Sequence, residues 1–425
     1  MGAKQISIHE LYYLANFLSK AGKSLERFRY FSSRPLSVIG QHLVTVLYFD
    51  EQNEPIAYGH LDNENGTVWL GTCVAEKETG KGFGTKVMQA LLNFAREKKI
   101  SKIRLSVDNI NLAAQKLYTS FGFTCVDKKE SISFFEWEAT KNPEILVSTL
   151  AFIGKSAEEI IHESKENNWC IEFSSGMPYR EDMESVFLSA PLLRYAHNYF
   201  PAPQKPFVLN LASSSTDIRK KSVEHCIRGL ELSEQVGARF FSAHAGFCID
   251  PSPEELGNPI APRKFSDRQS HFNYFVDSVL EILNRTKDLN AQFLIENNVI
   301  AKMNLYAAGI NPLLCCESSE IEKLMQIIPD QRLGLLLDTG HLKVSCETLG
   351  LDKMKELEKL SEFIVCIHHS DNSGVNDTNE ALGNDYWFLP FINRFPFTTH
   401  VLEVKKLNKE KIQQQLFLLR SGISP

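Results

Sequence analysis

The chain has 425 residues and a net charge of −6 at pH 7; 43% of the residues are hydrophobic and 23% are charged. This composition is that of a globular protein, so it excludes a disordered chain, and the acidic balance offers no basic footprint for nucleic acid. The length exceeds what one typical hydrophobic core fills, which predicts two domains.

Membrane-spanning and disulfide-stapled classes are also excluded. No window reaches the roughly 18–20 uninterrupted apolar residues of a membrane span, and the N-terminus lacks the order of a signal peptide. The nine cysteines form no pair of C-x2-C motifs, so neither a disulfide framework nor a structural zinc site is expected. We therefore expect a cytoplasmic protein with no membrane partner.

The part of the chain before about Thr140 mixes helical and extended patterns. The predicted elements are a helix at 9–20, strands at 42–49 and 67–76, a helix at 84–98 and a strand at 102–107. A glycine-rich turn at 80–84 joins a strand that ends at Glu76 to a helix that begins at Thr85. Glycines let backbone N–H groups approach a diphosphate closely, and the helix N-terminus adds a favourable dipole.

Residues 74–123 resemble the core of the GNAT-type N-acetyltransferases. The resemblance rests on the glycine-rich turn and on Asn111-x-x-Ala114, Leu117-Tyr118 and Phe121-Gly122-Phe123. It implies that residues 1–142 form a GNAT α/β domain that binds acetyl-CoA. The implied cofactor contacts are Thr79, Gly80, Lys81, Gly82, Gly84, Thr85 and Asn111.

The same resemblance implies roles for two further side chains. Tyr118 would protonate the departing CoA thiolate, and Glu76 is a candidate base for the acceptor amine. The family usually has Arg or Gln at the start of the loop; this chain has Thr79, which weakens the inference of activity more than that of the fold. Segments 28–34 and 58–62 resemble family members that occur with bacterial surface-polysaccharide genes, which implies an amino-sugar acceptor.

A new pattern starts after Lys141-Asn142-Pro143, where apolar strands alternate with polar-faced helices. The eight predicted strands are 145–152, 170–175, 192–200, 239–247, 292–298, 332–340, 363–369 and 399–404. Their number and spacing match a (β/α)8 TIM barrel over residues 143–425. The alternative is an open doubly wound sheet, but the first strand lacks the G-x-G-x-x-G that favours that fold.

Six of these strands end in a group that can bind a metal or a polar substrate. The six groups are His197, His244, Glu296, Asp338, His368 and Glu403. Barrel strands open their C-terminal ends onto one face, so these side chains are expected to converge. One polar residue at a strand end can be merely solvated, but six together predict a functional site.

The chain from residue 144 onwards resembles the AP endonuclease-like and xylose isomerase-like TIM barrels, which include sugar and sugar-phosphate isomerases and epimerases. The motifs are NLAS (210–213), HAG (244–246), IENN (295–298), DTGH (338–341), H-x-x-D-N-x-G (368–374) and LEV (402–404). The resemblance implies that the metal ligands are Glu296, Asp338, His368 and Glu403. It also implies that Glu296 and Glu403 are the general acid/base pair and that His341 lies beside the substrate.

Two further histidines, His197 and His244, are assigned to substrate binding or, alternatively, to a second metal. Three carboxylates and one imidazole suit Mn²⁺, Mg²⁺ or Zn²⁺, and chelation of a carbonyl and its neighbouring hydroxyl would stabilise an enediolate. We predict a bifunctional enzyme, an acetyl-CoA-dependent N-acetyltransferase fused to a metal-dependent isomerase or epimerase. Its substrate would be a small sugar, a sugar phosphate or a nucleotide sugar of carbohydrate or surface-polysaccharide biosynthesis.

We keep two alternative functions. The nuclease branch of the superfamily uses three metals and needs Asp-x-His after the seventh strand; this chain has Asp377-Thr378-Asn379, so no nucleic acid partner is expected. In the other alternative, one domain is a non-catalytic binding module. The aromatic segment 386–388, before the eighth strand, either stacks on a substrate or closes the barrel rim.

Overall fold

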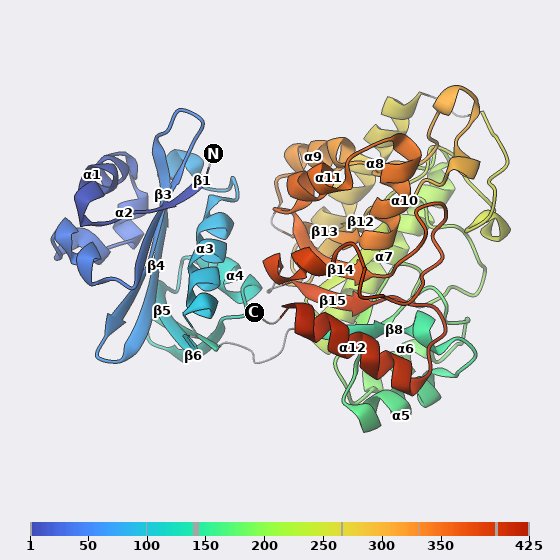
Figure 1. Ribbon diagram of the computed structural model, residues 1–425, viewed down its shortest axis with the longest axis horizontal. Helices are drawn as coiled ribbons and strands as arrows, with labels where there is room; N and C mark the ends of the chain where they lie inside the picture. Colours follow the sequence, from blue (N-terminus) through green and yellow to red (C-terminus); the bar gives the residue numbers. More distant parts are fainter. Residues whose placement is uncertain are drawn as a thin grey trace. The chain divides into compact units, whose positions relative to one another are not determined.

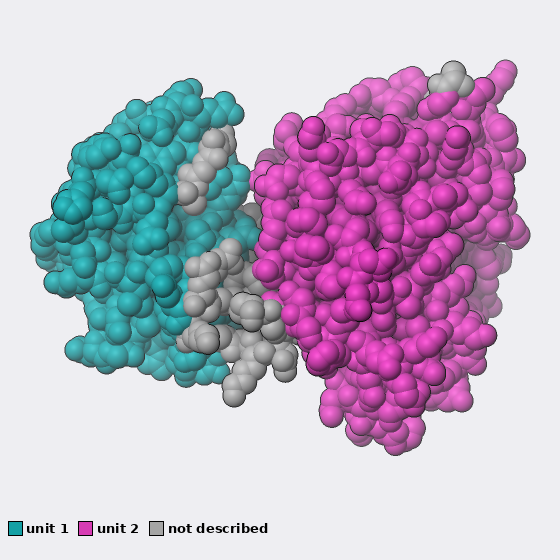
Figure 2. Space-filling view, in the orientation of Figure 1, with its two compact units in different colours: residues 1–141 teal, residues 142–425 magenta. Residues whose placement is uncertain are grey.

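The computed structural model describes residues 2–98, 100–138, 144–264, 267–330, 332–395 and 398–423 (Figure 1). The chain divides into two compact units, residues 1–141 and 142–425, which Figure 2 shows in separate colours. The domain boundary predicted at 142/143 lies outside the described residues. Within the described ranges, no helix is both long and apolar enough to cross a membrane.

The N-terminal unit contains a seven-stranded sheet in the order β1-β2-β3-β4-β5-β7-β6. Its strands are β1 (Gly2–Gln5), β2 (Val44–Phe49), β3 (Pro55–Glu64), β4 (Thr67–Val74), β5 (Lys102–Asp108), β6 (Thr124–Lys128) and β7 (Ile132–Glu138). Its helices are α1 (Leu11–Lys20), α2 (Ser24–Arg27), α3 (Phe83–Glu97) and α4 (Leu112–Ser120). The mixed α/β class predicted for this unit is confirmed.

Helices cover both faces of this sheet, and successive side chains of β3 point to one face and then to the other. Tyr58 points to one face, where its ring lies 5.9 Å from that of Phe17 on α1. Gly59 points to the other face, and a Cβ there would come within 2.3 Å of Val87 on α3. The absence of a side chain at Gly59 therefore lets α3 pack directly on the strand.

The glycine-rich turn differs from the predicted one at both ends. Strand β4 ends at Val74, not at Glu76, because residues 76–78 turn into a 3-10 helix. Helix α3 begins at Phe83, two residues before the predicted start. Gly80 and Gly82 have φ of +81° and +80°, a left-handed conformation that favours glycine.

The C-terminal unit is a parallel barrel of eight strands in the order β10-β9-β8-β15-β14-β13-β12-β11. The strands are β8 (Ile145–Ser148), β9 (Cys170–Phe173), β10 (Arg194–Ala196), β11 (Phe240–His244), β12 (Gln292–Glu296), β13 (Leu333–Asp338), β14 (Ile364–His369) and β15 (Thr399–Leu402). The helices are α5 (Ala157–Asn167), α6 (Met183–Ser189), α7 (Thr216–Val236), α8 (Arg268–Arg285), α9 (Ser318–Ile327), α10 (Thr339–Leu349), α11 (Lys353–Leu360) and α12 (Lys409–Ile423).

An isolated parallel bridge closes the barrel between its two outer strands. His197, just past β10, pairs with Ser242 of β11, and the backbone N–H of Asn198 donates to the Ser242 carbonyl at 2.6 Å. The sheet is therefore a closed barrel and not the open doubly wound sheet considered as the alternative.

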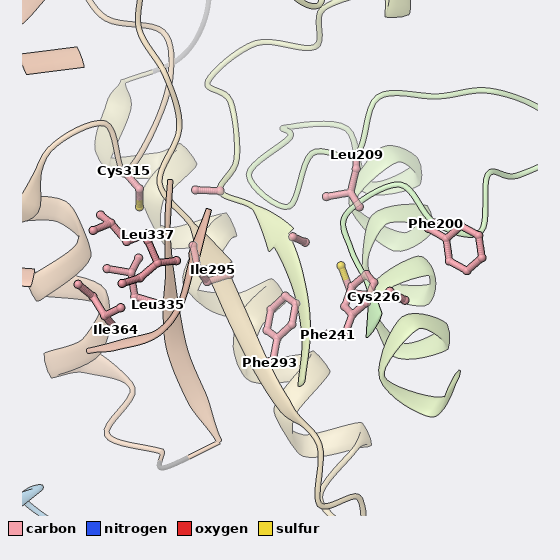
Figure 3. Packing of buried hydrophobic residues seen from close by; sticks show 14 of the residues in the cluster. Phe200, Leu209, Cys226, Phe241, Phe293, Ile295, Cys315, Leu335, Leu337 and Ile364 are labelled. Atoms are coloured by element: carbon pink, nitrogen blue, oxygen red, sulfur yellow. The ribbon is translucent and has the colours of Figure 1, made fainter. Parts of the chain in front are cut away.

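Alternate residues of the barrel strands face two different cores. Outward-facing side chains such as Phe241, Phe293 and Leu337 pack against the surrounding helices, for example against Cys226 of α7 (Figure 3). A second cluster gathers side chains from alternate strand positions inside the barrel: Leu146, Tyr195, Phe240, Leu294, Leu336, Cys366 and Val401. This inner apolar layer forms the floor on which the candidate site is built.

Candidate active site

The site residues follow the inner apolar layer by two positions along most strands. Since strand side chains alternate with period two, a residue two positions after an inward-facing one also faces inward, nearer the C-terminal end. This places Ser148, Glu172, His197, Ser242, Glu296, Asp338, His368 and Glu403 in one polar layer, with His244 two residues beyond Ser242. All six strand-end groups predicted from the sequence lie in or directly above this layer.

Four of these groups form one candidate metal site. Glu296, Asp338, His368 and Glu403 each offer one ligand atom, and these atoms lie within 4.8 Å of one another. His368 Nδ1 lies 2.8 Å from Glu403 Oε2, 3.8 Å from Glu296 Oε1 and 3.9 Å from Asp338 Oδ2. Two carboxylate oxygens, Glu296 Oε2 and Asp338 Oδ2, are buried without a hydrogen-bond partner among the described residues. Such oxygens fit a cation, because a buried carboxylate oxygen without a hydrogen bond is costly.

Glu296 also belongs to a second candidate site. Its Oε2 lies 3.2 Å from His197 Nε2 and 3.4 Å from His244 Nδ1, and the three residues form a separate cluster of possible ligands. His197 is held by a hydrogen bond of 2.8 Å between its Nδ1 and the Ser242 hydroxyl. The geometry therefore accommodates either substrate contacts or a second metal at these two histidines, with Glu296 shared between the two clusters.

The DTGH segment carries one candidate ligand and aims a histidine at the site. Asp338 is the N-cap of α10, and its Oδ1 accepts a hydrogen bond of 2.7 Å from the backbone N–H of His341. This leaves Oδ2 free to face the site. A Cβ at Gly340 would come within 2.6 Å of Ser370 Oγ, so a larger residue in this turn would displace the side chain of Ser370 on the loop after β14.

His341 lies between the metal quartet and the loop after β14. Its Nδ1 is 2.9 Å from the Asn297 carbonyl and 3.4 Å from Glu296 Oε1, and its Nε2 is 3.3 Å from Asp377 Oδ2. Asn379, which replaces the histidine of the nuclease branch, has φ of +49°, and its carbonyl accepts a hydrogen bond of 2.9 Å from the backbone N–H of Lys405.

Burial and neighbouring charges move the pKa values of these groups in opposite directions. Burial raises the pKa of Asp338 to about 8, with Glu403 and Asp377 adding to the effect. Burial also acts to raise the pKa of Glu403, but the paired His368 ring overcomes it and holds that pKa at about 2. The carboxylates of Glu172 and Glu403 raise the pKa of His368 well above its usual range, although burial opposes them.

The prediction from the sequence did not include three residues of the site. Glu172 on β9 is fully buried and lies 3.0 Å from His368 Nε2. Asp377 faces His341, and the Asn297 side chain bonds both the N–H and the carbonyl of Asp338, at 2.7 and 3.1 Å. IENN and the Asp-x-Asn segment were noted as motifs, which was a usable signal for Asn297 and Asp377; for Glu172 the only signal was one carboxylate in a short apolar strand.

The aromatic segment after β14 packs into the barrel rim. The Tyr386 hydroxyl lies 2.6 Å from Thr339 Oγ1 and 2.9 Å from His369 Nδ1. Trp387 donates its indole N–H to the Thr339 carbonyl at 3.2 Å, and Phe388 is fully buried. These contacts favour rim closure over stacking on a substrate. His369 faces away from the quartet, and its Nε2 lies 2.9 Å from His400 Nδ1.

The residues predicted to act on acetyl-CoA in the N-terminal unit lie on the turn after β4, at the start of α3, and on α4 and its N-cap. The buried Tyr118 hydroxyl lies 3.3 Å from Thr72 Oγ1 on β4, and burial raises the pKa of Tyr118, which favours the protonated form of an acid. Thr79, Gly80, Lys81 and Gly82 are exposed on the turn, and Gly84 and Thr85 lie in the first turn of α3.

Two other predicted residues of this unit are engaged within the protein. The Asn111 side chain caps α4 through the Ala114 N–H at 3.3 Å, and it also accepts a hydrogen bond of 3.4 Å from Arg27. Glu76 accepts a hydrogen bond of 3.1 Å from the backbone N–H of Lys23 at the start of α2. Both contacts therefore compete with the cofactor and base roles expected from the sequence.

Comparisons with known proteins agree with this division of the chain. The family described as "Acetyltransferase (GNAT) family" matches residues 7–123, and the family described as "Xylose isomerase-like TIM barrel" matches residues 152–410. A curated relative, "Probable endonuclease 4" of Aquifex aeolicus, is 26% identical over 194 residues, which cover 43% of this chain and 60% of the relative. The protein of the same name from Persephonella marina is 27% identical over 218 residues, 45% of this chain and 68% of the relative.

A solved structure shares the barrel fold. The crystal structure of a D-tagatose 3-epimerase-like protein superposes with a TM-score of 0.50 at 16% identity and covers 66% of this chain and 97% of that one. The chain thus spans about 60% of the length of the first curated relative, while it spans nearly all of this structural neighbour.

Proposed function

Because the chain belongs to the xylose isomerase-like TIM barrel family and carries a GNAT acetyltransferase domain before the barrel, we propose that it is a bifunctional sugar-modifying enzyme. In this proposal the barrel isomerises or epimerises a small sugar, sugar phosphate or nucleotide sugar, and the N-terminal domain acetylates an amine with acetyl-CoA. The observation that carries the barrel activity is that two buried carboxylate oxygens, Glu296 Oε2 and Asp338 Oδ2, have no hydrogen-bond partner among the described residues and lie within a quartet of possible ligands.

A divalent cation would be held by this quartet, Glu296, Asp338, His368 and Glu403. Three carboxylates and one imidazole suit Mn²⁺, Mg²⁺ or Zn²⁺. Such a cation, when bound, supplies Lewis-acid stabilisation of the negative charge that develops on substrate oxygens during proton abstraction.

We assign proton transfer to Glu296 and Glu403, the two glutamates of the quartet. Glu403 is the more accessible of the two, with 12% of its side chain exposed against 1% for Glu296. The His368 ring holds Glu403 ionised, as a base must be before it accepts a proton from carbon. His244, whose side chain is 27% exposed, and His341 would contact the substrate hydroxyls at the mouth of the site.

Solvent isotope exchange tests this proposal. The cation-loaded full-length protein would be incubated in D₂O with a panel of sugar phosphates and nucleotide sugars, and deuterium next to the carbonyl would be detected by NMR. We expect exchange with at least one substrate and none in Glu403→Gln. Glu356→Gln is a matched control, because Glu356 is also buried but bonds Ser318 and Lys359 outside the site. A wild-type protein that binds the cation yet exchanges no substrate of the panel would overturn the proposal.

In the N-terminal domain, we propose that the turn at 79–85 binds the pyrophosphate of acetyl-CoA. Gly80 and Gly82 leave open space around their Cα atoms, so the backbone of the turn is accessible, and the N-terminus of α3 follows directly. Tyr118 would protonate the CoA thiolate as the amide forms on the acceptor amine. We propose an amino sugar as the acceptor.

Phosphodiester cleavage in DNA is the second candidate function of the barrel. Two observations favour it: curated relatives named "Probable endonuclease 4", and the cluster of His197, His244 and Glu296 beside the quartet. Asn379 opposes it, because the resembling nucleases have histidine there. An abasic-site oligonucleotide should stay intact with the wild-type protein; metal-dependent cleavage that is lost in His244→Ala would favour the nuclease.

A further inference from the structure

Glu172 is a buried carboxylate that none of the assigned roles uses. It points into the barrel from β9 with no exposed surface, and its Oε1 lies 3.0 Å from His368 Nε2. Its other oxygen, Oε2, has no hydrogen-bond partner among the described residues. A carboxylate in this position costs desolvation energy, so its retention calls for a partner that needs a negative charge.

The two nitrogens of the His368 ring face different groups. Nδ1 faces the quartet, 2.8 Å from Glu403 Oε2, whereas Nε2 faces Glu172 Oε1. A neutral imidazole has one N–H donor and one lone pair, so only the tautomer with hydrogen on Nε2 presents a lone pair to a cation at the quartet. We propose that Glu172 is a positioning residue that fixes this tautomer and ring orientation of His368 and so strengthens cation binding.

A comparison with His197 shows why the support must be a carboxylate. Ser242 supports the His197 ring through Nδ1 at 2.8 Å, but a hydroxyl can both donate and accept, so it leaves the tautomer open. An ionised Glu172 can only accept, which leaves one arrangement for His368. Outer carboxylates of this kind also make the ligating imidazole more basic.

This inference rests on the proposed function only in placing a divalent cation at the quartet. The alternative role for Glu172 is that of a direct ligand, because Glu172, His197 and His368 also form a cluster of possible ligands whose atoms lie within 4.8 Å of one another. If Glu172 were a direct ligand, its loss would remove a bound ion and not merely weaken one.

The test compares Glu172→Gln and Glu172→Met with the wild-type full-length protein. Co²⁺ affinity and stoichiometry would be measured by competition with a chromophoric chelator, and the Co²⁺ absorption bands would report the ligand geometry. We expect Glu172→Met to bind about 10–100-fold more weakly with shifted bands and unchanged stoichiometry. Glu172→Gln keeps an oxygen acceptor, so its affinity should lie between those of Glu172→Met and the wild type.

A urea unfolding curve of each metal-free variant separates positioning from a structural role. Removing one partner of a buried pair is destabilising, so metal-free Glu172→Met should unfold more easily than the wild type, whereas Glu172→Gln, which keeps an acceptor for His368 Nε2, should not. Glu356→Gln, which removes another buried carboxylate, should keep wild-type affinity and bands.

Three results would overturn the positioning role: wild-type Co²⁺ affinity in both Glu172 variants, the loss of one bound ion, or a metal-free Glu172→Gln that unfolds markedly more easily than the wild type. These readouts use no sugar substrate. Absence of isotope exchange in the wild type would therefore refute the proposed function and leave the role of Glu172 standing. Unchanged Co²⁺ binding in the Glu172 variants would refute the role of Glu172 and leave the proposed function standing.

Discussion

Replacing Glu296 by Gln should remove most of the stabilisation that a divalent cation gives the barrel. Glu296 has four histidine nitrogens within 3.2–3.8 Å, and it is shared by the quartet and by the cluster with His197 and His244. One neutral substitution therefore weakens both candidate sites. Loss of a direct ligand should cost at least the upper end of the 10–100-fold range that is typical of outer supports.

The size of the effect follows from binding linkage. At a cation concentration of about 100 Kd, the wild-type protein gains about 2.7 kcal/mol of unfolding free energy. A 100-fold weaker site at the same concentration gains only about 0.4 kcal/mol. For a unit of this size, the metal-induced rise in Tm should fall from about 5–10 °C to about 1 °C.

Differential scanning fluorimetry with and without Mn²⁺ or Zn²⁺ measures this rise. Each variant is compared with its own metal-free form, so any change in the stability of the metal-free protein cancels. Glu356→Gln should keep the full wild-type rise, because Glu356 lies outside both ligand clusters. An undiminished rise in Glu296→Gln would refute the assignment of both clusters.

Three predictions concern the N-terminal unit. Tyr118→Phe removes the proposed acid, the hydroxyl that lies 3.3 Å from Thr72 Oγ1. The kcat for acetyl transfer, measured by thiol release, should therefore fall about 100-fold while the affinity for acetyl-CoA stays unchanged. An unchanged kcat would exclude Tyr118 as the acid. Gly71→Ala places a Cβ 2.3 Å from His60 Cε1 and should lower the free energy of unfolding in urea by about 1–3 kcal/mol; no change would contradict the close packing. Burial lowers the pKa of His42 to about 4, below its value near 6.5 in the unfolded chain. The buried neutral ring therefore makes its full contribution to the free energy of unfolding above pH 6.5, and this contribution is lost as the pH falls to 4. After allowance for its partial exposure, the loss should be about 1 kcal/mol, and His42→Asn should flatten the pH dependence of the urea midpoint.

The barrel fold was predictable because its signal is local and repeated: apolar strands followed by polar ends recur along the chain. Convergence then follows from topology alone, since parallel strands deliver their C-terminal ends to one face. This is why His197, Glu296 and Glu403 could be grouped although they are far apart in the chain. Which cluster each histidine joins was not predictable, since that depends on side-chain distances.

The residues missed by the sequence are those whose partners are remote. Glu172 meets His368 across 196 positions, and within CIEFSS one glutamate reads equally well as the solvent-facing member of an alternating strand. Strand β3 was missed for a different reason: Pro55, Gly59 and Asp62 interrupt its apolar pattern, although the strand pairs on both sides. Pairing with β2 and β4 and the burial of Ile56, Tyr58 and Leu61 hold that segment.

The single bridge between β10 and β11 makes their junction the most weakly paired one in the barrel. His197 stands on one side of it and His244 on the other, and both face Glu296 of the next strand. An ion bound by these three residues would hold the two strands together across the junction. Amide hydrogen exchange in residues 240–244 should then accelerate when the ion is removed by a chelator, so the exchange rate of β11 reports whether the ion is bound without the need for a substrate.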